Sequence, residues 1–238
     1  MTTRDIAVLT AVVLVVAAVF LFVAPIPQDP AYHAFTDRRT LFGVANFWNV
    51  FSNLPFLVVG AWGVFYVMRY GQAVSLPGLE LAYIVFFSGV FLTAFGSAYY
   101  HLTPANDPLA WDRLPMTIGF AGLFAVIVGE FVSPRLGRML VLPLLLVGVV
   151  SVEYWIWTES RGMGDLRLYA LVQFLPMLLI PFILAFYRPA IGSGKYFWAM
   201  LGFYVLSKIV EFLDAPIFGA GGLISGHSLK HLFAAAAT

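Results

Sequence analysis

Long apolar stretches, separated by short clusters of proline, glycine and charged residues, divide the chain into eight segments. Most of these stretches approach the length of about 20 residues that a helix needs to cross a hydrocarbon core roughly 30 Å thick. They predict helices near residues 6–24, 47–68, 80–101, 113–133, 137–157, 166–187, 195–213 and 226–238. The pattern therefore predicts an all-α fold, a polytopic membrane helix bundle, without an internal repeat.

The two end segments differ from the other six. The apolar run at 6–24 is longer than the apolar core of a signal peptide and follows a weakly basic start, so we interpret it as an uncleaved span. The last segment has 13 residues, which as a helix reach only about 20 Å. Either it packs among other helices as a partial span, or the chain is truncated there.

Composition agrees with a membrane location, since 61% of the residues are hydrophobic and only 11% are charged. Soluble domains are less apolar and carry about twice this share of charge. The net charge of +1 and the lack of a Walker-type loop argue against nucleic-acid binding and ATP-driven transport. Because cysteine is absent, any bound metal would need His, Asp or Glu ligands.

The loop charges give a weak preference for one orientation. The side of the amino terminus carries six basic residues: Arg4, Arg69, Arg135, Arg138, Arg188 and Lys195. The opposite, more acidic side carries five: Arg38, Arg39, Arg113, Arg161 and Arg167. By the positive-inside rule, the amino terminus is cytoplasmic and the acidic side extracytoplasmic.

Three of the four histidines are expected to meet on the acidic side. His101 ends the third predicted helix, whereas His227 and His231 begin the last one and share a face because they are four residues apart. Three imidazoles with an open fourth position are typical of catalytic zinc. A single His at a membrane boundary is usually only an interfacial polar residue, so the shared side and depth carry the prediction.

Asp112 and Ser97 are candidate partners of this site. Asp112 precedes Arg113 near the start of the fourth predicted helix, where a carboxylate can serve as a general base or orient a ligand histidine. An N-cap or an ion pair with Arg113 is the ordinary alternative. Ser97 lies one turn before His101 and can donate to an oxyanion or merely bond its own i−4 carbonyl.

Other ionisable residues fall inside predicted spans, where they are costly and commonly functional. Lys208 and Glu211 are three residues apart and are expected to pair, which also argues against a retinal Schiff base on this lysine. Glu130, Glu153 and Glu211 leave open a transporter or channel with an ion path, although no pair of broken helices supports it.

Four stretches resemble the alkaline ceramidase family, part of a superfamily of seven-helix membrane hydrolases that includes the adiponectin and progestin receptors. They are the FWN and SN signature within 46–53, Ser97 with His101, Asp112, and the pair His227 and His231. The resemblance extends from about residue 31 to the end of the chain. It implies a seven-helix hydrolase core at 31–238, preceded by an additional helix and linker at 1–30.

The resemblance implies zinc on His101, His227 and His231, with Asp112 and Ser97 as catalytic partners. It also implies hydrolysis of the amide bond in ceramide-like N-acyl lipids taken from the bilayer, releasing a fatty acid and a sphingoid-type amine. A receptor-like protein with a structural zinc and little turnover is the alternative.

The family also suggests a calcium site before the first core helix, for which Asp37 and Asn46 are the candidate ligands. Two departures weaken the prediction of calcium. Arg38 and Arg39 follow Asp37, and Asn46 stands where a Glu is usual. On the same side, the segment 158–167 is a candidate gate for lipid or headgroup access.

Overall fold

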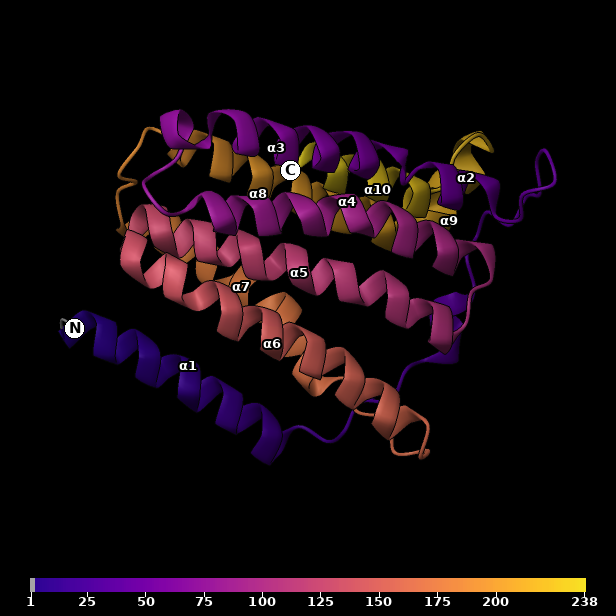
Figure 1. Cartoon of the computed structure of the whole chain (residues 1–238). Coiled ribbons are helices and arrows are strands. Elements are labelled where there is room, and N and C mark those ends of the chain that lie inside the picture. The colour runs from indigo at the N-terminus through magenta and orange to yellow at the C-terminus, as the bar shows by residue number, and fades with distance from the viewer. Residues whose placement is uncertain (1–2) are drawn as a thin grey trace.

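The computed structural model describes residues 3–238 and contains helices but no β-strand in that part of the chain (Figure 1). The helices are α1 (Thr3–Phe22), α2 (Phe47–Phe51), α3 (Leu54–Val74), α4 (Glu80–Leu102), α5 (Asn106–Phe131), α6 (Pro134–Glu159), α7 (Arg167–Phe186), α8 (Gly194–Phe212), α9 (Asp214–Gly221) and α10 (Gly226–Ala236), with a 3₁₀ turn at Pro30–His33.

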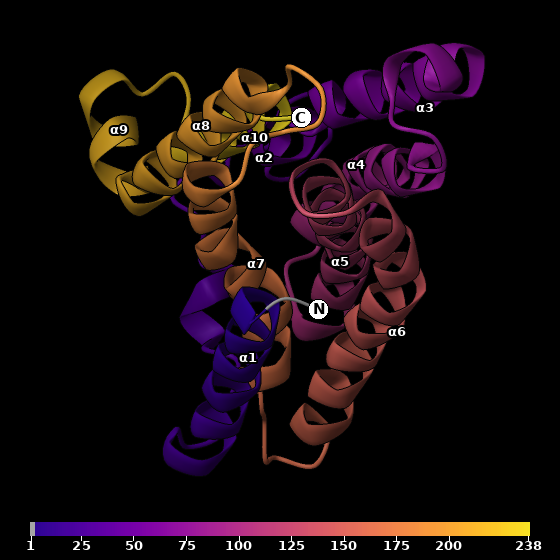
Figure 2. The same cartoon turned by 90° about the vertical axis from the view of Figure 1, so that its left-hand side faces the viewer.

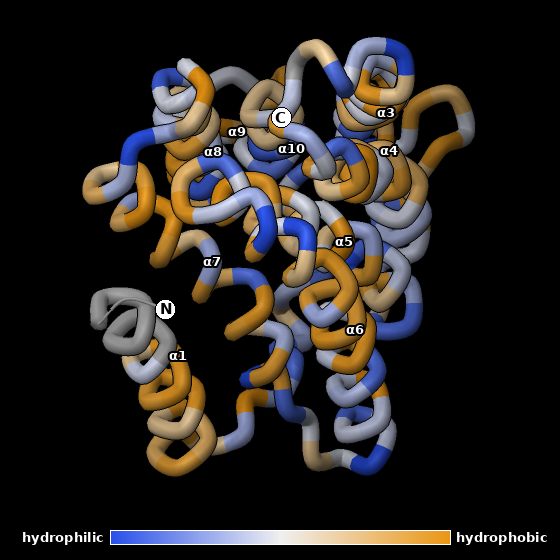
Figure 3. Tube along the Cα trace, turned by 60° about the vertical axis from the view of Figure 1, so that its left-hand side comes forward, coloured by the Kyte–Doolittle hydropathy of each residue, from blue (hydrophilic) through white to orange (hydrophobic). Residues whose placement is uncertain are grey.

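Within the described part of the chain, five helical stretches are long and apolar enough to cross a membrane, and a sixth is added if the bent pair α8 and α9 counts as one span. This confirms the predicted multi-pass helix bundle. Helix α5 lies at its centre, because 61% of its apolar window is buried inside the protein, compared with 22% for α7. Helices α4, α6 and α7 pack directly against α5, and the outer helices carry many exposed, large apolar side chains. The arrangement of these helices and the hydropathy along them can be followed in Figures 1 and 3.

Glycines bring α4 and α5 together along their length. A Cβ added at Gly89 would collide with the backbone of Gly119, and one added at Gly96 would collide with the carbonyl of Trp111. Small residues allow membrane helices this close approach. The tight crossing holds the carboxyl end of α4 beside the amino-terminal half of α5.

Helix α10 packs between α3 and α8, on the side of the bundle away from α6 (Figure 2). Its start requires Gly226, because a side chain there would meet the carbonyl of Val210 on α8. The short final segment thus lies among other helices of the bundle.

The observed helices differ from the predicted ones in several places. Helix α5 begins at Asn106 rather than near 113, because Pro108 falls in its first turn, where no amide donor is needed. The expected break at 214–226 contains α9, which is bent by 73° from α8. The first core helix is interrupted at Ser52 and Asn53, which separate α2 from α3.

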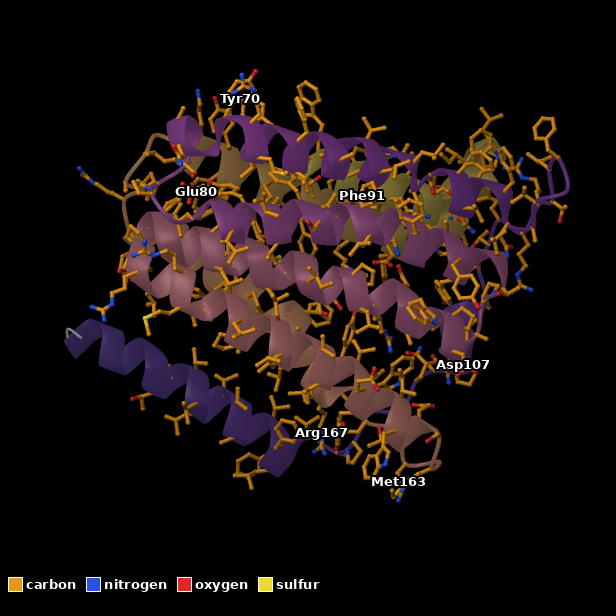
Figure 4. The ribbon with its side chains drawn as sticks, viewed as in Figure 1. Tyr70, Glu80, Phe91, Asp107, Met163 and Arg167 are labelled. Carbon is orange, nitrogen blue, oxygen red and sulfur yellow. The ribbon has the colours of Figure 1, made fainter. Side chains whose placement is uncertain are left out.

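Helix α1 stands apart from the bundle and is fastened at its carboxyl end (Figure 1). The Arg167 guanidinium donates to the carbonyl oxygens of Phe20 and Val23, at 3.4 and 2.7 Å, and the amide of Leu166 donates to Ile26. Arg167 lies where the end of α1 meets the start of α7 (Figure 4).

Asp165 fixes this arginine in turn. Its carboxylate accepts from Arg167 Nε at 2.9 Å and Nη2 at 2.7 Å, and from the Tyr154 hydroxyl at 2.8 Å. The hydrogen bonds from Arg167 outweigh the effect of burial and lower the pKa of Asp165 to about 2. The candidate gate segment 158–167 is thus tied to the end of α1.

Glu130 lies in α5 at the opposite end of the bundle and is 2% exposed. The hydroxyls of Tyr83 and Ser193 donate to its two carboxylate oxygens, and the amide of Ala190 donates to its backbone carbonyl. These bonds explain why a carboxylate is buried here, because they attach the loop between α7 and α8 to the central helix.

Candidate metal centre

The structure brings His101, His227 and His231 together inside the bundle. They come from the end of α4 and the first turns of α10, and their exposures are 1%, 8% and 4%. One ring nitrogen of each lies within 4.8 Å of the others.

The spacing of these nitrogens fits a tetrahedral ion. His101 Nε2 and His227 Nε2 are 3.4 Å apart, and two ligand nitrogens at zinc bond lengths of about 2.0–2.1 Å are separated by about 3.4 Å. The group contains no carboxylate, so its possible ligands are three imidazole nitrogens. This donor set and this spacing suit zinc.

Residues of the 46–53 stretch hold the histidine helices from outside. Ser52 Oγ lies 2.7 Å from His231 Nδ1, so Nε2 is the nitrogen of that ring that remains available to a metal ion. The Asn46 amide donates to the backbone carbonyl of His101 at 2.8 Å. Asn49 accepts from the Ser228 hydroxyl at 2.7 Å. The 46–53 stretch therefore connects α2 to both α4 and α10 through side-chain hydrogen bonds.

The sequence analysis assigned no role to two further residues that contact the histidine cluster, Phe35 and Asp214. Phe35, which is 6% exposed, packs its ring centroid 4.6 Å from those of both His101 and His227. The Asp214 carboxylate accepts from the amide of His227 at 2.7 Å and from that of Thr36 at 3.3 Å. No local motif marks these contacts, because each joins segments more than 60 residues apart except the short Asp214 link to α10.

Ser97 and Asp112 meet across the crossing of α4 and α5. The Ser97 hydroxyl and the Asp112 carboxyl lie close to each other, and both residues line one cavity with His231. Asp112 lies well inside α5, so it is not an N-cap. Arg113 does not pair with it and instead donates to Gln28 Oε1 at 2.6 Å.

The cavity has a volume of about 460 Å³ and extends from these polar groups into the apolar interior. Its apolar wall comes from several helices and includes Phe86, Leu123, Met177, Ile180, Phe197 and Leu201. A mostly apolar chamber with a few converging polar groups is the usual form of a small-molecule site. Its mostly apolar lining is compatible with an apolar chain.

The two candidate calcium ligands make separate contacts. Asp37 is bound by Arg39, whose Nε and Nη2 donate at 2.9 and 2.7 Å, and this guanidinium also donates to the carbonyls of residues 222 and 223. Burial opposes ionisation of Asp37, but the hydrogen bonds from Arg39 prevail and hold its pKa below the usual range. Asn46 is engaged with His101 instead.

The fourth histidine, His33, has a different role. Its Nδ1 lies 3.0 Å from the Tyr100 hydroxyl and its Nε2 lies 3.0 Å from Asn106 Oδ1. Both ring nitrogens are thus occupied by protein groups. Among the described residues, the three-histidine cluster is the group of His, Asp or Glu side chains arranged to hold a metal ion.

The fold and this site define an integral, multi-pass membrane protein with a buried histidine cluster able to hold a metal ion. The sequence model of the family described as Ceramidase matches residues 40–213, well over half of the chain, so the protein belongs to the ceramidase family. Membership implies a hydrolase acting on amides. The match includes Ser97, His101 and Asp112 and ends before His227. No curated protein matches the chain.

Proposed function

We propose that the protein is a zinc-dependent membrane hydrolase that cleaves the amide bond of ceramide-like N-acyl lipids. The products are a fatty acid and a sphingoid-type amine. The proposal rests on one observation: a single cavity is lined by His231, Asp112 and Ser97 and by the apolar side chains of several helices. A lipid amide bound there would have its chain in the apolar part and its carbonyl beside the polar groups.

His101, His227 and His231 would hold the metal. When bound, zinc supplies Lewis acidity, which polarises a carbonyl and activates water as a nucleophile. The packing of Phe35 on two of the rings keeps them fixed and limits solvent. Ser52 fixes the third ring through Nδ1.

Asp112 carries the proton transfers in this proposal. Its carboxylate takes a proton from the attacking water as the carbon–oxygen bond forms, and it then delivers that proton to the amide nitrogen as the carbon–nitrogen bond breaks. The Ser97 hydroxyl, which lies close to this carboxyl, would orient it during the proton transfers. Once Asp112 has taken the proton and can itself donate to Ser97 Oγ, the single O–H of Ser97 would donate to the oxyanion that develops on the carbonyl oxygen.

The test is fatty-acid release from a panel of N-acyl lipids by the purified protein in detergent. Asp112→Asn should lower kcat by about 10²–10⁴-fold, the usual contribution of a general base, and should retain zinc. Asp107→Asn is the matched control, since Asp107 is an exposed carboxylate in the first turn of the same helix. Full zinc without release of any fatty acid by the wild type would favour the receptor-like alternative instead.

We also propose that the histidine cluster opens to the side opposite the amino terminus, the extracytoplasmic side. The weak excess of basic residues on the other side supports this orientation. The chain has no cysteine, so Ser160→Cys and Lys195→Cys provide single labels on exposed residues at opposite ends of the bundle. In intact cells, a membrane-impermeant maleimide should label position 160 and spare 195, and the reverse labelling would contradict this orientation.

A further inference from the structure

Two lysines share one glutamate on the wall of the cavity. Lys208 Nζ lies 2.8 Å from Glu211 Oε2, and Lys230 Nζ lies 2.8 Å from Glu211 Oε1. All three side chains are partly buried and line the cavity. Each carboxylate oxygen is thus engaged by a different lysine, and the cluster keeps one positive charge in excess.

A third cation lines the same cavity. Arg113 is 6% exposed, and its guanidinium stacks 4.1 Å from the Trp155 ring and 4.6 Å from the Tyr169 ring. Its hydrogen-bond partner is the neutral amide of Gln28. Its other terminal nitrogen, Nη1, has no hydrogen-bond partner in the described part of the chain. Arg113 therefore brings charge into the cavity without a direct ion pair to a carboxylate in the described part of the chain, although Asp112 lies close enough to interact with it electrostatically.

The charges that face the cavity do not cancel. Its charged lining residues are Asp112, Arg113, Lys208, Glu211 and Lys230. These are three cations and two carboxylates, and electrostatic interactions couple Asp112 to Lys230, Arg113 and Glu211. An unpaired charge within a membrane protein is costly and marks function by default. An anionic group on a bound ligand would neutralise the excess.

We propose that Lys208, Lys230 and Arg113 form a subsite for an anionic group, such as a carboxylate or phosphate, on the amine half of the substrate. This inference rests on the proposed amidase function. The acyl carbonyl must lie at the histidines and Asp112, so a second polar group in the same cavity belongs to the other half of the lipid. A neutral sphingoid headgroup would leave the excess charge unpaired.

The test compares matched lipids that differ only in charge. N-oleoylglycine and N-oleoylethanolamine share chain and amide but end in a carboxylate and a hydroxymethyl group. N-oleoylsphingosine and its 1-phosphate form a second pair. The selectivity ratio is kcat/KM for the anionic lipid divided by that for its neutral partner. We expect a ratio above about ten, on the scale of a single close charge interaction.

Two variants distinguish an anion subsite from a purely structural ion pair between α8 and α10. One removes a positive charge from the cluster, and the other removes a negative charge. Lys230→Met should lower the ratio about tenfold, and Glu211→Gln should raise it by a similar factor. Glu211 keeps Lys208 as a partner in the first variant. Lys195→Met, which removes an exposed lysine at the other end of the bundle, should leave the ratio unchanged.

A purely structural pair gives a different result. Both Lys230→Met and Glu211→Gln would then lower the activity on anionic and neutral lipids alike, with an unchanged ratio, and this would overturn the subsite. If the wild type cleaves no lipid, the proposed function fails separately. Calorimetric binding of N-oleoylglycine and N-oleoylethanolamine to the same variants then tests the subsite, and equal affinities for the two lipids would overturn it.

Discussion

Substitution of Ser52 by alanine removes the outer support of the metal centre without changing any ligand. Ser52 Oγ lies 2.7 Å from His231 Nδ1 and 3.3 Å from the carbonyl oxygen of Asn49. With Nε2 directed at a metal, Nδ1–H donates to this hydroxyl, which in turn donates its own hydrogen bond to the carbonyl oxygen of Asn49. The alanine variant leaves the buried Nδ1–H without an acceptor.

The expected loss follows from that unpaired donor. A buried polar group deprived of its partner costs about 1–3 kcal/mol, and the loss of an outer support of a ligand histidine typically lowers metal affinity about 10–100-fold. The free-energy cost and the loss of affinity agree, because about 1.4 kcal/mol corresponds to a tenfold change in the dissociation constant. We therefore expect Ser52→Ala to bind zinc about 10–100-fold more weakly, with the helix bundle intact.

The assay is competition for zinc against a chromophoric chelator in detergent. Ser160→Ala is the matched control, because Ser160 is exposed and donates only to the carbonyl of Trp157. Ser52→Thr, which keeps the hydroxyl, should recover most of the affinity. Equal zinc affinity in Ser52→Ala and the wild type would refute the proposed role of this hydrogen bond.

Three further predictions follow from the packing and the site. Gly226→Ala should lower the melting temperature and abolish zinc binding, because its Cβ would collide with the α8 backbone, whereas Gly219→Ala meets nothing within 4 Å and should be neutral. Ser97→Ala should lower kcat by about 10²–10³-fold, as for an oxyanion donor, with unchanged zinc content. The pKa of Asp165 is lowered in the folded state, so its contribution to stability is present above the unfolded value of about 3.9 and is lost as pH falls toward 2. The melting temperature of Asp165→Asn should therefore lie below that of the wild type at pH 7. This difference in melting temperature should shrink as the pH is lowered. A difference that persists unchanged near pH 2 would contradict the prediction.

The histidine cluster was predictable because its geometry depends on local spacing and on the sides of helices. The four-residue interval between His227 and His231 fixes a common face, and the alternation of spans places His101 at the same end of the bundle. The pair of Lys208 and Glu211 was predictable for the same reason, and its 2.8 Å separation confirms it.

The supports of the site were not predictable, because they join segments that are distant in the sequence. Phe35 reaches rings on α4 and α10, and Ser52 reaches across 179 positions to His231. The boundary of α5 was misplaced because Asp107 and Pro108 read as a loop, although both are favourable in the first turn of a helix. The second lysine bound to Glu211, Lys230, lies in α10, so the spacing of residues within α8 could not predict this ion pair.

The central claim is that His101, His227 and His231 hold the zinc on which amide hydrolysis depends. The most direct measurement is zinc content together with fatty-acid release, for the purified wild type and His231→Ala, before and after chelation and return of zinc. The account predicts one zinc per wild-type chain, loss of hydrolysis on chelation with recovery on zinc, and neither zinc nor hydrolysis in His231→Ala. Zinc content unchanged by His231→Ala, or hydrolysis that persists in the chelated protein, would contradict it.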